Sequence, residues 1–209
     1  MLKIPCPSCA APVEFISKAT VFAVCAHCNS TLLRQDLELQ HIGQMAVLQD
    51  DFSPLQLHTV GYYNNERFEI IGRMQKTWDA GSWNEWYLYF DGIKEGWLAE
   101  AQGFYMVSFA TNSNDKLPSR EELVPGLTVK IASKIFTIDD IKNVRCSFSQ
   151  GELPVKAFHG SLSCSVDLSG PDKLFACLDY TDEETRVYVG GYQEFAQFRF
   201  SNLKELDGW

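Results

Sequence analysis

Aromatic and β-branched residues come in short runs along most of the chain, and turn-forming residues separate these runs. This texture begins at Leu57 and is typical of β-strands. In the run Trp86–Phe90, successive side chains point to opposite faces of a strand, and both faces are apolar or aromatic. We therefore expect this strand to be covered on both sides. The clearest runs are Phe68–Met74, Trp86–Phe90 and Phe104–Phe109.

The pattern recurs after a polar connection at 112–126. The segments that echo each other are 61–70 with 129–138, and 86–98 with 174–190. Two halves of the chain, about 57–111 and 126–200, thus share a strand order without close identity. The sequence predicts a mainly β fold in which two similar antiparallel half-barrels or small sheets pack together.

Four cysteines near the N-terminus form two Cys-x2-Cys pairs that are separated by fifteen residues. They are Cys6, Cys9, Cys25 and Cys28. This spacing is typical of a structural zinc site with four thiolate ligands. Strand-like segments at 13–16, 20–24 and 31–33 would complete a zinc ribbon. Two disulfides, or a redox-active Cys-x2-Cys pair, are the alternatives.

The residues next to these cysteines allow expectations about the backbone of the two loops. Positive φ is favoured after the second cysteine of such a loop, which suits Asn29 and strains Ala10. His27 is expected to be an exposed surface residue, because four cysteines already supply the ligands. Outside the ribbon, Cys146 and Cys177 lie in strand-like runs and are expected to be small buried hydrophobes.

A linker is expected between the ribbon (1–35) and the β-rich domain (57–209). In it, apolar residues recur at three-residue intervals, which predicts a short helix or turn within 36–56. These residues are Leu39, Ile42, Met45 and Leu48.

Composition and charge exclude several classes of protein and of binding partner. The 209 residues are 45% hydrophobic and carry a net charge of −9, which excludes a disordered chain. No run approaches the roughly 18 apolar residues of a membrane-spanning helix, and no signal peptide is visible, so we expect a cytoplasmic protein. The acidic body disfavours nucleic-acid binding, because that depends on neutralising phosphates with basic residues.

A dense aromatic segment holds four of the five tryptophans between residues 78 and 97. One interpretation is a core with tyrosine hydroxyl groups at its rim. A second is a site for a polyamine or another cation, held by carboxylates beside tryptophan rings. A third is a docking surface for a protein or basic partner. The residues that would form such a site are Trp83, Glu85, Trp86, Trp97 and Glu100.

Recognisable catalytic motifs are missing. The sequence contains no glycine-rich phosphate loop, no His-Glu-x2-His and no Gly-x-Ser-x-Gly. We therefore expect no catalytic residues, although an unrecognised enzyme stays open.

Several segments together resemble family 4178 of bacterial domains of unknown function, in versions preceded by a zinc ribbon. The segments are 5–9, 25–28, 68–74, 83–88, 96–100, 151–154, 167–171 and 201–206. The resemblance implies a fold and little chemistry, since the family has no settled activity. The gene neighbours of the family imply an accessory role in an envelope-stress or polyamine-linked system.

The leading hypothesis from the sequence is a non-enzymatic zinc-ribbon adaptor. Its ribbon would dock on one protein partner, and its β body would present an aromatic, acidic face to a second. The alternatives are a domain that senses or binds a polyamine or another cation, and an unrecognised enzyme.

Overall fold

The computed structural model describes residues 2–45, 52–91, 94–112 and 115–205, and these residues are mostly β-strand. Helix in these ranges is limited to three short 3₁₀ segments, Arg120–Glu122, Pro171–Lys173 and Phe195–Phe198. Within the described ranges, no helix has the length and apolar character that crossing a membrane requires.

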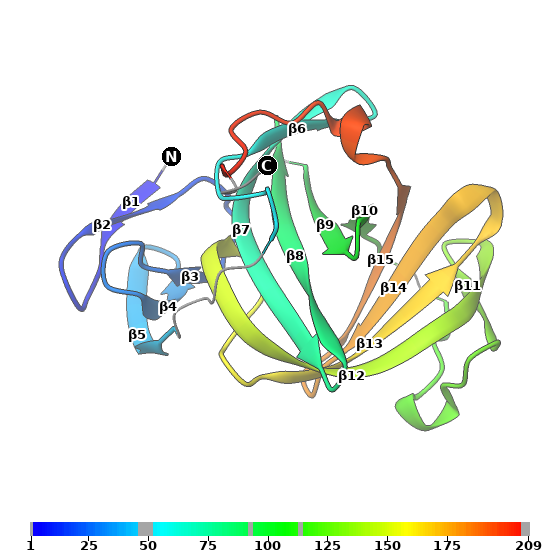
Figure 1. The fold of residues 1–209 in the computed structure, drawn as a ribbon. Coiled ribbons are helices and arrows are strands. Elements are labelled where there is room, and N and C mark those ends of the chain that lie inside the picture. The colour runs from blue at the N-terminus through cyan, green and yellow to red at the C-terminus, as the bar shows by residue number, and fades with distance from the viewer. Residues whose placement is uncertain (1, 46–51, 92–93, 113–114, 206–209) are drawn as a thin grey trace.

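Eight antiparallel strands close into a barrel (Figure 1). Each strand pairs with the next around the ring, and the pairing of β12 with β7 completes it. In ring order the strands are β7 (Glu66–Trp78), β8 (Gly81–Phe90), β9 (Glu95–Ala101), β10 (Phe104–Ala110), β15 (Thr185–Tyr192), β14 (Leu174–Tyr180), β13 (Leu162–Ser169) and β12 (Lys134–Leu153). The expected mainly β fold is confirmed, and the two half-barrels share one closed ring.

Each half of the chain contributes four strands to the ring and one strand outside it, and the order of these five strands is the same in both halves. The first half opens with a hairpin of β6 (Val60–Tyr63) and β7, and the second with a hairpin of β11 (Thr128–Ile131) and β12. The halves meet where β7 pairs with β12 and where β10 pairs with β15. By this order β13 is the counterpart of β8. The expected match of 174–190 with 86–98 is therefore wrong by one strand, because residues 162–169 form a further strand that the expected order did not include.

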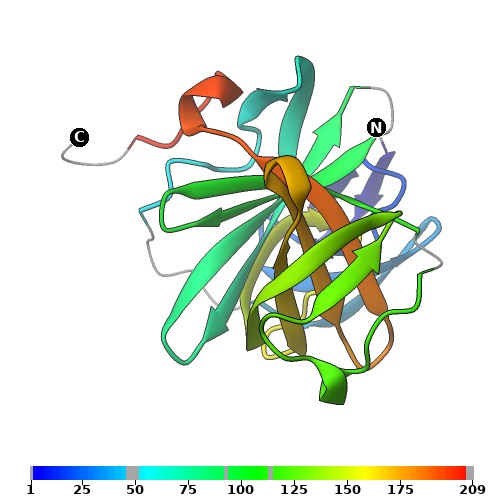
Figure 2. The ribbon, with the colours of Figure 1, turned by 90° about the vertical axis from the view of Figure 1, so that its right-hand side faces the viewer.

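Apolar clusters cover the outer faces of the barrel on both halves. On the first half, Trp86, Leu88 and Phe90 pack with Phe198, which lies in the C-terminal 3₁₀ segment. On the second half, the β11 hairpin covers the outward side chains of β12 to β15, among them Val166 and Leu178. Figure 2 shows this hairpin in front of the barrel. The expectation that Trp86–Phe90 is covered on both faces is confirmed.

The N-terminal ribbon extends past residue 35 to the end of β5 and contains five short strands. Strands β1 (Leu2–Pro5) and β2 (Pro12–Phe15) form a separate two-stranded sheet, while β3 (Phe22–Val24), β4 (Ser30–Gln35) and β5 (Glu38–Gln44) extend the large sheet from the edge of β12. The helix or turn expected in 36–56 is wrong for the segment 38–44, which is a strand. Hydrogen bonds to β4 override the three-residue spacing there. Leu48 lies outside the described residues.

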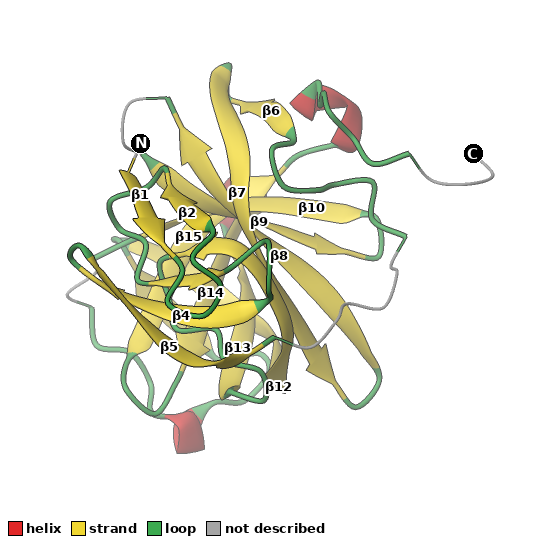
Figure 3. Ribbon diagram, turned by 90° about the vertical axis from the view of Figure 1, so that its left-hand side faces the viewer, coloured by secondary structure: helices red, strands yellow, loops and turns green. Residues whose placement is uncertain are grey.

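One carboxylate anchors the ribbon to the barrel. Glu152, at the end of β12, is 5% exposed and accepts hydrogen bonds from the backbone N–H groups of Ile16 (2.8 Å) and Ser17 (3.2 Å) and from the hydroxyl group of Thr20 (2.7 Å). Nearby, β3 pairs with β12. Seen from the ribbon side in Figure 3, β1 to β5 lie in front of the barrel. The ribbon and the barrel therefore share buried contacts.

Glycines permit close contact where the two halves meet. A Cβ atom on Gly72 would lie 1.8 Å from the carbonyl oxygen of Glu152, across the β7–β12 pairing. At the other junction, a Cβ atom on Gly190 would lie 1.7 Å from the carbonyl oxygen of Val107. A side chain at either position would force the strands apart.

We predict that Gly190→Ala lowers the free energy of unfolding by about 2 kcal/mol or more, because the added methyl group meets rigid backbone. The neighbouring Gly191→Ala is the matched control, since its Cβ atom would approach nothing closer than 3.6 Å. That control should change stability by less than about 0.5 kcal/mol. Urea unfolding followed by circular dichroism measures both. Equal effects would contradict the proposed close contact.

Candidate functional site

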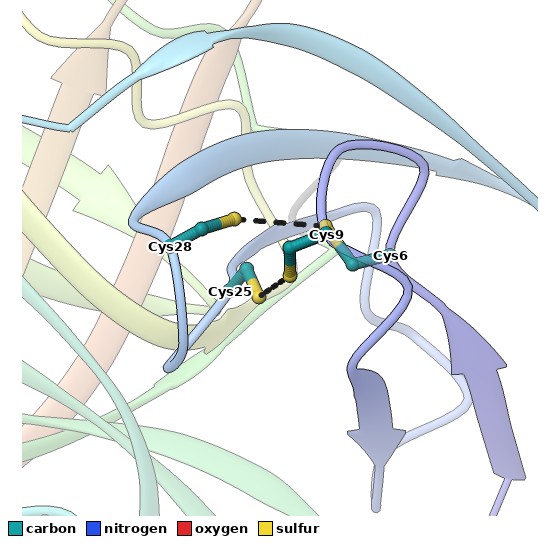
Figure 4. A group of neighbouring side chains, drawn as sticks. All are labelled: Cys6, Cys9, Cys25 and Cys28. Carbon is teal, nitrogen blue, oxygen red and sulfur yellow. Dashed lines mark hydrogen bonds between the residues drawn. The ribbon is translucent and has the colours of Figure 1, made fainter.

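The four ribbon cysteines come together at one point (Figure 4). Their sulfur atoms all lie within 4.8 Å of one another. The Sγ atoms of Cys6 and Cys28 are 3.8 Å apart, as are those of Cys9 and Cys25. A tetrahedron with metal–sulfur bonds of about 2.3 Å requires sulfur–sulfur distances of about 3.8 Å, whereas a disulfide requires about 2.05 Å. The geometry therefore fits a metal ion with four thiolate ligands.

The two Cys-x2-Cys loops have matching backbone geometry. The N–H group of Ala10 donates to the carbonyl of Cys6, and that of Asn29 donates to the carbonyl of Cys25, both at 2.9 Å. Both donor residues have positive φ, 61° for Ala10 and 56° for Asn29, as expected. His27 is exposed, also as expected. Hydrogen bonds with Ser30 lower the pKa of the Cys28 thiol to about 6, whereas burial raises the pKa of the Cys25 thiol.

The remaining cysteines occupy three different environments. Cys146 and Cys164 are buried in apolar clusters. The expectation of a buried small hydrophobe is confirmed for Cys146 but wrong for Cys177, which is only partly buried and lines the interior of the barrel. It lies at an inward position of β14, between the outward residues Ala176 and Leu178.

The barrel encloses a cavity of about 770 Å³. Its walls contain three tryptophans, Trp78, Trp83 and Trp97, together with other aromatic and methionine side chains. Phe104 and Tyr192, at strand ends around one opening, are 64% and 49% exposed. Six carboxylates and three basic side chains also line the cavity. It is therefore both aromatic and acidic, and its size suits a small organic molecule.

A buried ion pair links the two halves of the barrel inside the cavity. The Lys76 ammonium group, on β7, lies 3.2 Å from Glu85 on β8 and 3.2 Å from Asp179 on β14. Burial opposes this charge, but the two carboxylates outweigh burial and raise the pKa of Lys76. Arg186 lies 4.0 Å from Asp179. The positive charges of Lys76 and Arg186 thus offset the negative charges of Glu85 and Asp179.

Asp167 differs from these paired residues. Its carboxylate lines the cavity, and no hydrogen bond or ion pair holds it among the described residues. Burial raises the pKa of Asp167 to about 6, with a smaller opposing effect from Lys142. The Lys142 ammonium group lies 5.5 Å from the centroid of the Trp78 ring. The cavity therefore holds an unpartnered carboxylate, and one of its tryptophan rings already faces a cation.

The five residues expected to form a single site lie on two sides of the sheet. Trp83, Glu85 and Trp97 line the cavity. Trp86 and Glu100 lie on the outer side, where the Trp86 indole N–H donates to Glu100 at 2.9 Å. Side chains alternate along a strand, so residues 83 and 85 share a face that residue 86 cannot.

The expected site residues did not include Lys76 or the cavity residues of the second half. Their common signal is an isolated charged residue at an alternate position of an apolar strand, which is costly to bury unless it is paired or functional. These residues are Lys76, Asp167, Asp179 and Arg186.

We predict that the purified protein, supplied with Zn²⁺, binds one ion per chain, and that Cys25→Ala abolishes this stoichiometric binding. The matched control is Cys164→Ala, which removes a buried thiol far from the cluster in the sequence and should retain one ion. Elemental analysis after gel filtration measures both. Full metal content in Cys25→Ala would contradict the four-thiolate site.

Comparison with known protein families gives a match for most of the chain. The model of a family described as a domain of unknown function (DUF4178) matches residues 56–195. The matched segment covers the barrel and leaves the ribbon outside. Neither curated proteins nor solved structures give a match. Since the family model covers more than half of the sequence, the chain belongs to the DUF4178 family.

Proposed function

We propose that this protein is a non-enzymatic binding protein that holds a small organic cation inside its barrel. The observation that carries the proposal is the aromatic cavity with its unpartnered carboxylate, Asp167. Aromatic faces attract cations, and a partly buried carboxylate such as Asp167 gains from an ammonium partner. A protonated amine with an apolar body, such as a polyamine or alkylamine, satisfies both.

The reactive groups in the cavity support binding rather than catalysis. Burial raises the pKa of the Cys177 thiol, and that of the Tyr188 hydroxyl group, so both groups stay protonated at neutral pH. A protonated thiol is a poor nucleophile.

For the ribbon we propose structural Zn²⁺, held by Cys6, Cys9, Cys25 and Cys28. Four protein ligands leave no open coordination position, which fits a structural ion. Free thiols at this site suit a reducing compartment, so we propose a cytoplasmic location. Docking of the ribbon on a partner protein, as in the adaptor hypothesis, stays a prediction.

The charge of the ligand is tested with three eight-carbon probes: octylammonium, 1-octanol and octanoate. We predict that octylammonium binds at least about tenfold more tightly than octanoate, which the cavity carboxylates repel. Spermidine should also bind. Asp167→Asn should weaken octylammonium binding by about tenfold, whereas Asp182→Asn, the same change at an exposed turn, should not. Isothermal titration calorimetry measures the affinities. Equal binding of the three probes would contradict a cation site.

The affinity for octylammonium should also depend on pH. The pKa of Asp167 is about 6, so its carboxylate is largely ionised at pH 7.5 and largely protonated at pH 5. The probe keeps its charge over this range. We therefore predict that affinity falls about tenfold from pH 7.5 to pH 5. In Asp167→Asn this loss should shrink. An affinity that rises on acidification would contradict the assigned role of Asp167.

A further inference from the structure

The wall of the barrel cavity at Met74, Trp97 and Val155, which we call its floor, packs against the ribbon. Met74, Trp97 and Val155 line the cavity, and the same three side chains belong to a buried cluster with Phe22 and Val24 of β3. Phe22 has no exposed surface, and its ring packs edge-on against Phe158 at a centroid distance of 5.6 Å. Ribbon side chains therefore lie directly behind the cavity wall.

Polar contacts fix the ribbon against the same end of the barrel. The Ser17 hydroxyl group donates to Glu95, at the start of β9, and lies 3.4 Å from the hydroxyl group of Tyr87. Tyr87 in turn packs against Trp97, with ring centroids 5.2 Å apart. With Glu152, these contacts link the loop that precedes β3 to the residues that position Trp97.

The metal cluster is continuous in sequence with this floor. Cys25 directly follows Val24, and Cys28 lies two residues before β4, the strand that pairs with β3. A module of this size cannot bury enough apolar surface to fold alone, and a bound metal ion supplies the missing folding free energy. Loss of the ion would therefore release Phe22 and Val24 from the cluster behind the cavity.

We propose that the metal ion of the four-cysteine cluster controls the ligand cavity of the barrel. With the ion bound, the ribbon closes the floor and holds Trp97 in place. Without it, the floor opens and the cavity binds its ligand more weakly. The ligand part of this inference rests on the proposed function. Because such coupling is reciprocal, the ligand must in turn strengthen metal binding.

The first test needs no ligand. Hydrogen–deuterium exchange of the full chain is measured with Zn²⁺ bound and after its removal with a chelator. Removal should speed exchange in the ribbon, at the start of β9 and at the end of β12, and leave β13 and β14 protected. Faster exchange confined to the ribbon would overturn the proposal.

The second test measures the affinity for octylammonium by calorimetry in the same two states. Metal removal should weaken binding by about tenfold, within the usual range of coupling between sites, and restored Zn²⁺ should recover it. Equal affinity in both states would overturn the proposal.

A pair of variants separates loss of the floor from unfolding of the whole chain. Phe22→Ala should keep one metal ion per chain and still weaken octylammonium binding by about tenfold. Leu37→Ala is the control, since Leu37 lies in the turn between β4 and β5 and is 70% exposed. If metal removal unfolds the whole barrel, these variants decide: unchanged binding by metal-loaded Phe22→Ala would overturn the proposal.

If octylammonium binds to no form, the proposed function fails, and the exchange experiment alone decides whether the metal holds the floor.

Discussion

Most barrel strands bury side chains on both of their faces, because the ring has an inside and an outside and both carry apolar residues. The outer faces need cover, which the β6 and β11 hairpins and the segment around Phe198 provide. The inner faces of eight strands leave a cavity of about 770 Å³. The proposed binding in the interior therefore depends on the covering elements, because they allow aromatic residues to point inward without forming the main core.

Charge inside the barrel takes two forms with different consequences. Lys76 is paired with Glu85 and Asp179, so it connects the two halves and has little capacity left for a ligand. Asp167 has no such partner and lies among aromatic walls, which makes it the group that a cation would neutralise. Phe22 and Val24 of the ribbon belong to the same buried cluster as the cavity residue Trp97, so the ribbon and the barrel interior form one packed unit.

The sequence predicted local features better than long-range ones. Cysteine spacing predicted the metal cluster, and residue texture predicted the strands, because both depend on neighbouring residues. Ring closure depends on Gly72 meeting Gly151 across 79 positions, which no local pattern encodes. The strand at 38–44 was missed because its pairing with β4 outweighs its spacing. Alternation along β8 would have separated Glu85 from Trp86, and isolated charges such as Asp167 would have indicated the cavity.

The central claim, that a cation binds inside the barrel, is tested most directly by the indole N–H signals of the tryptophans in a ¹H–¹⁵N NMR spectrum. Trp83 and Trp97 line the cavity, whereas Trp86 lies outside it and donates its indole N–H to Glu100. On titration with spermidine, the signals of Trp83 and Trp97 should shift in a saturable way while that of Trp86 stays in place. Constant signals from Trp83 and Trp97, or a shift of Trp86 alone, would contradict the claim.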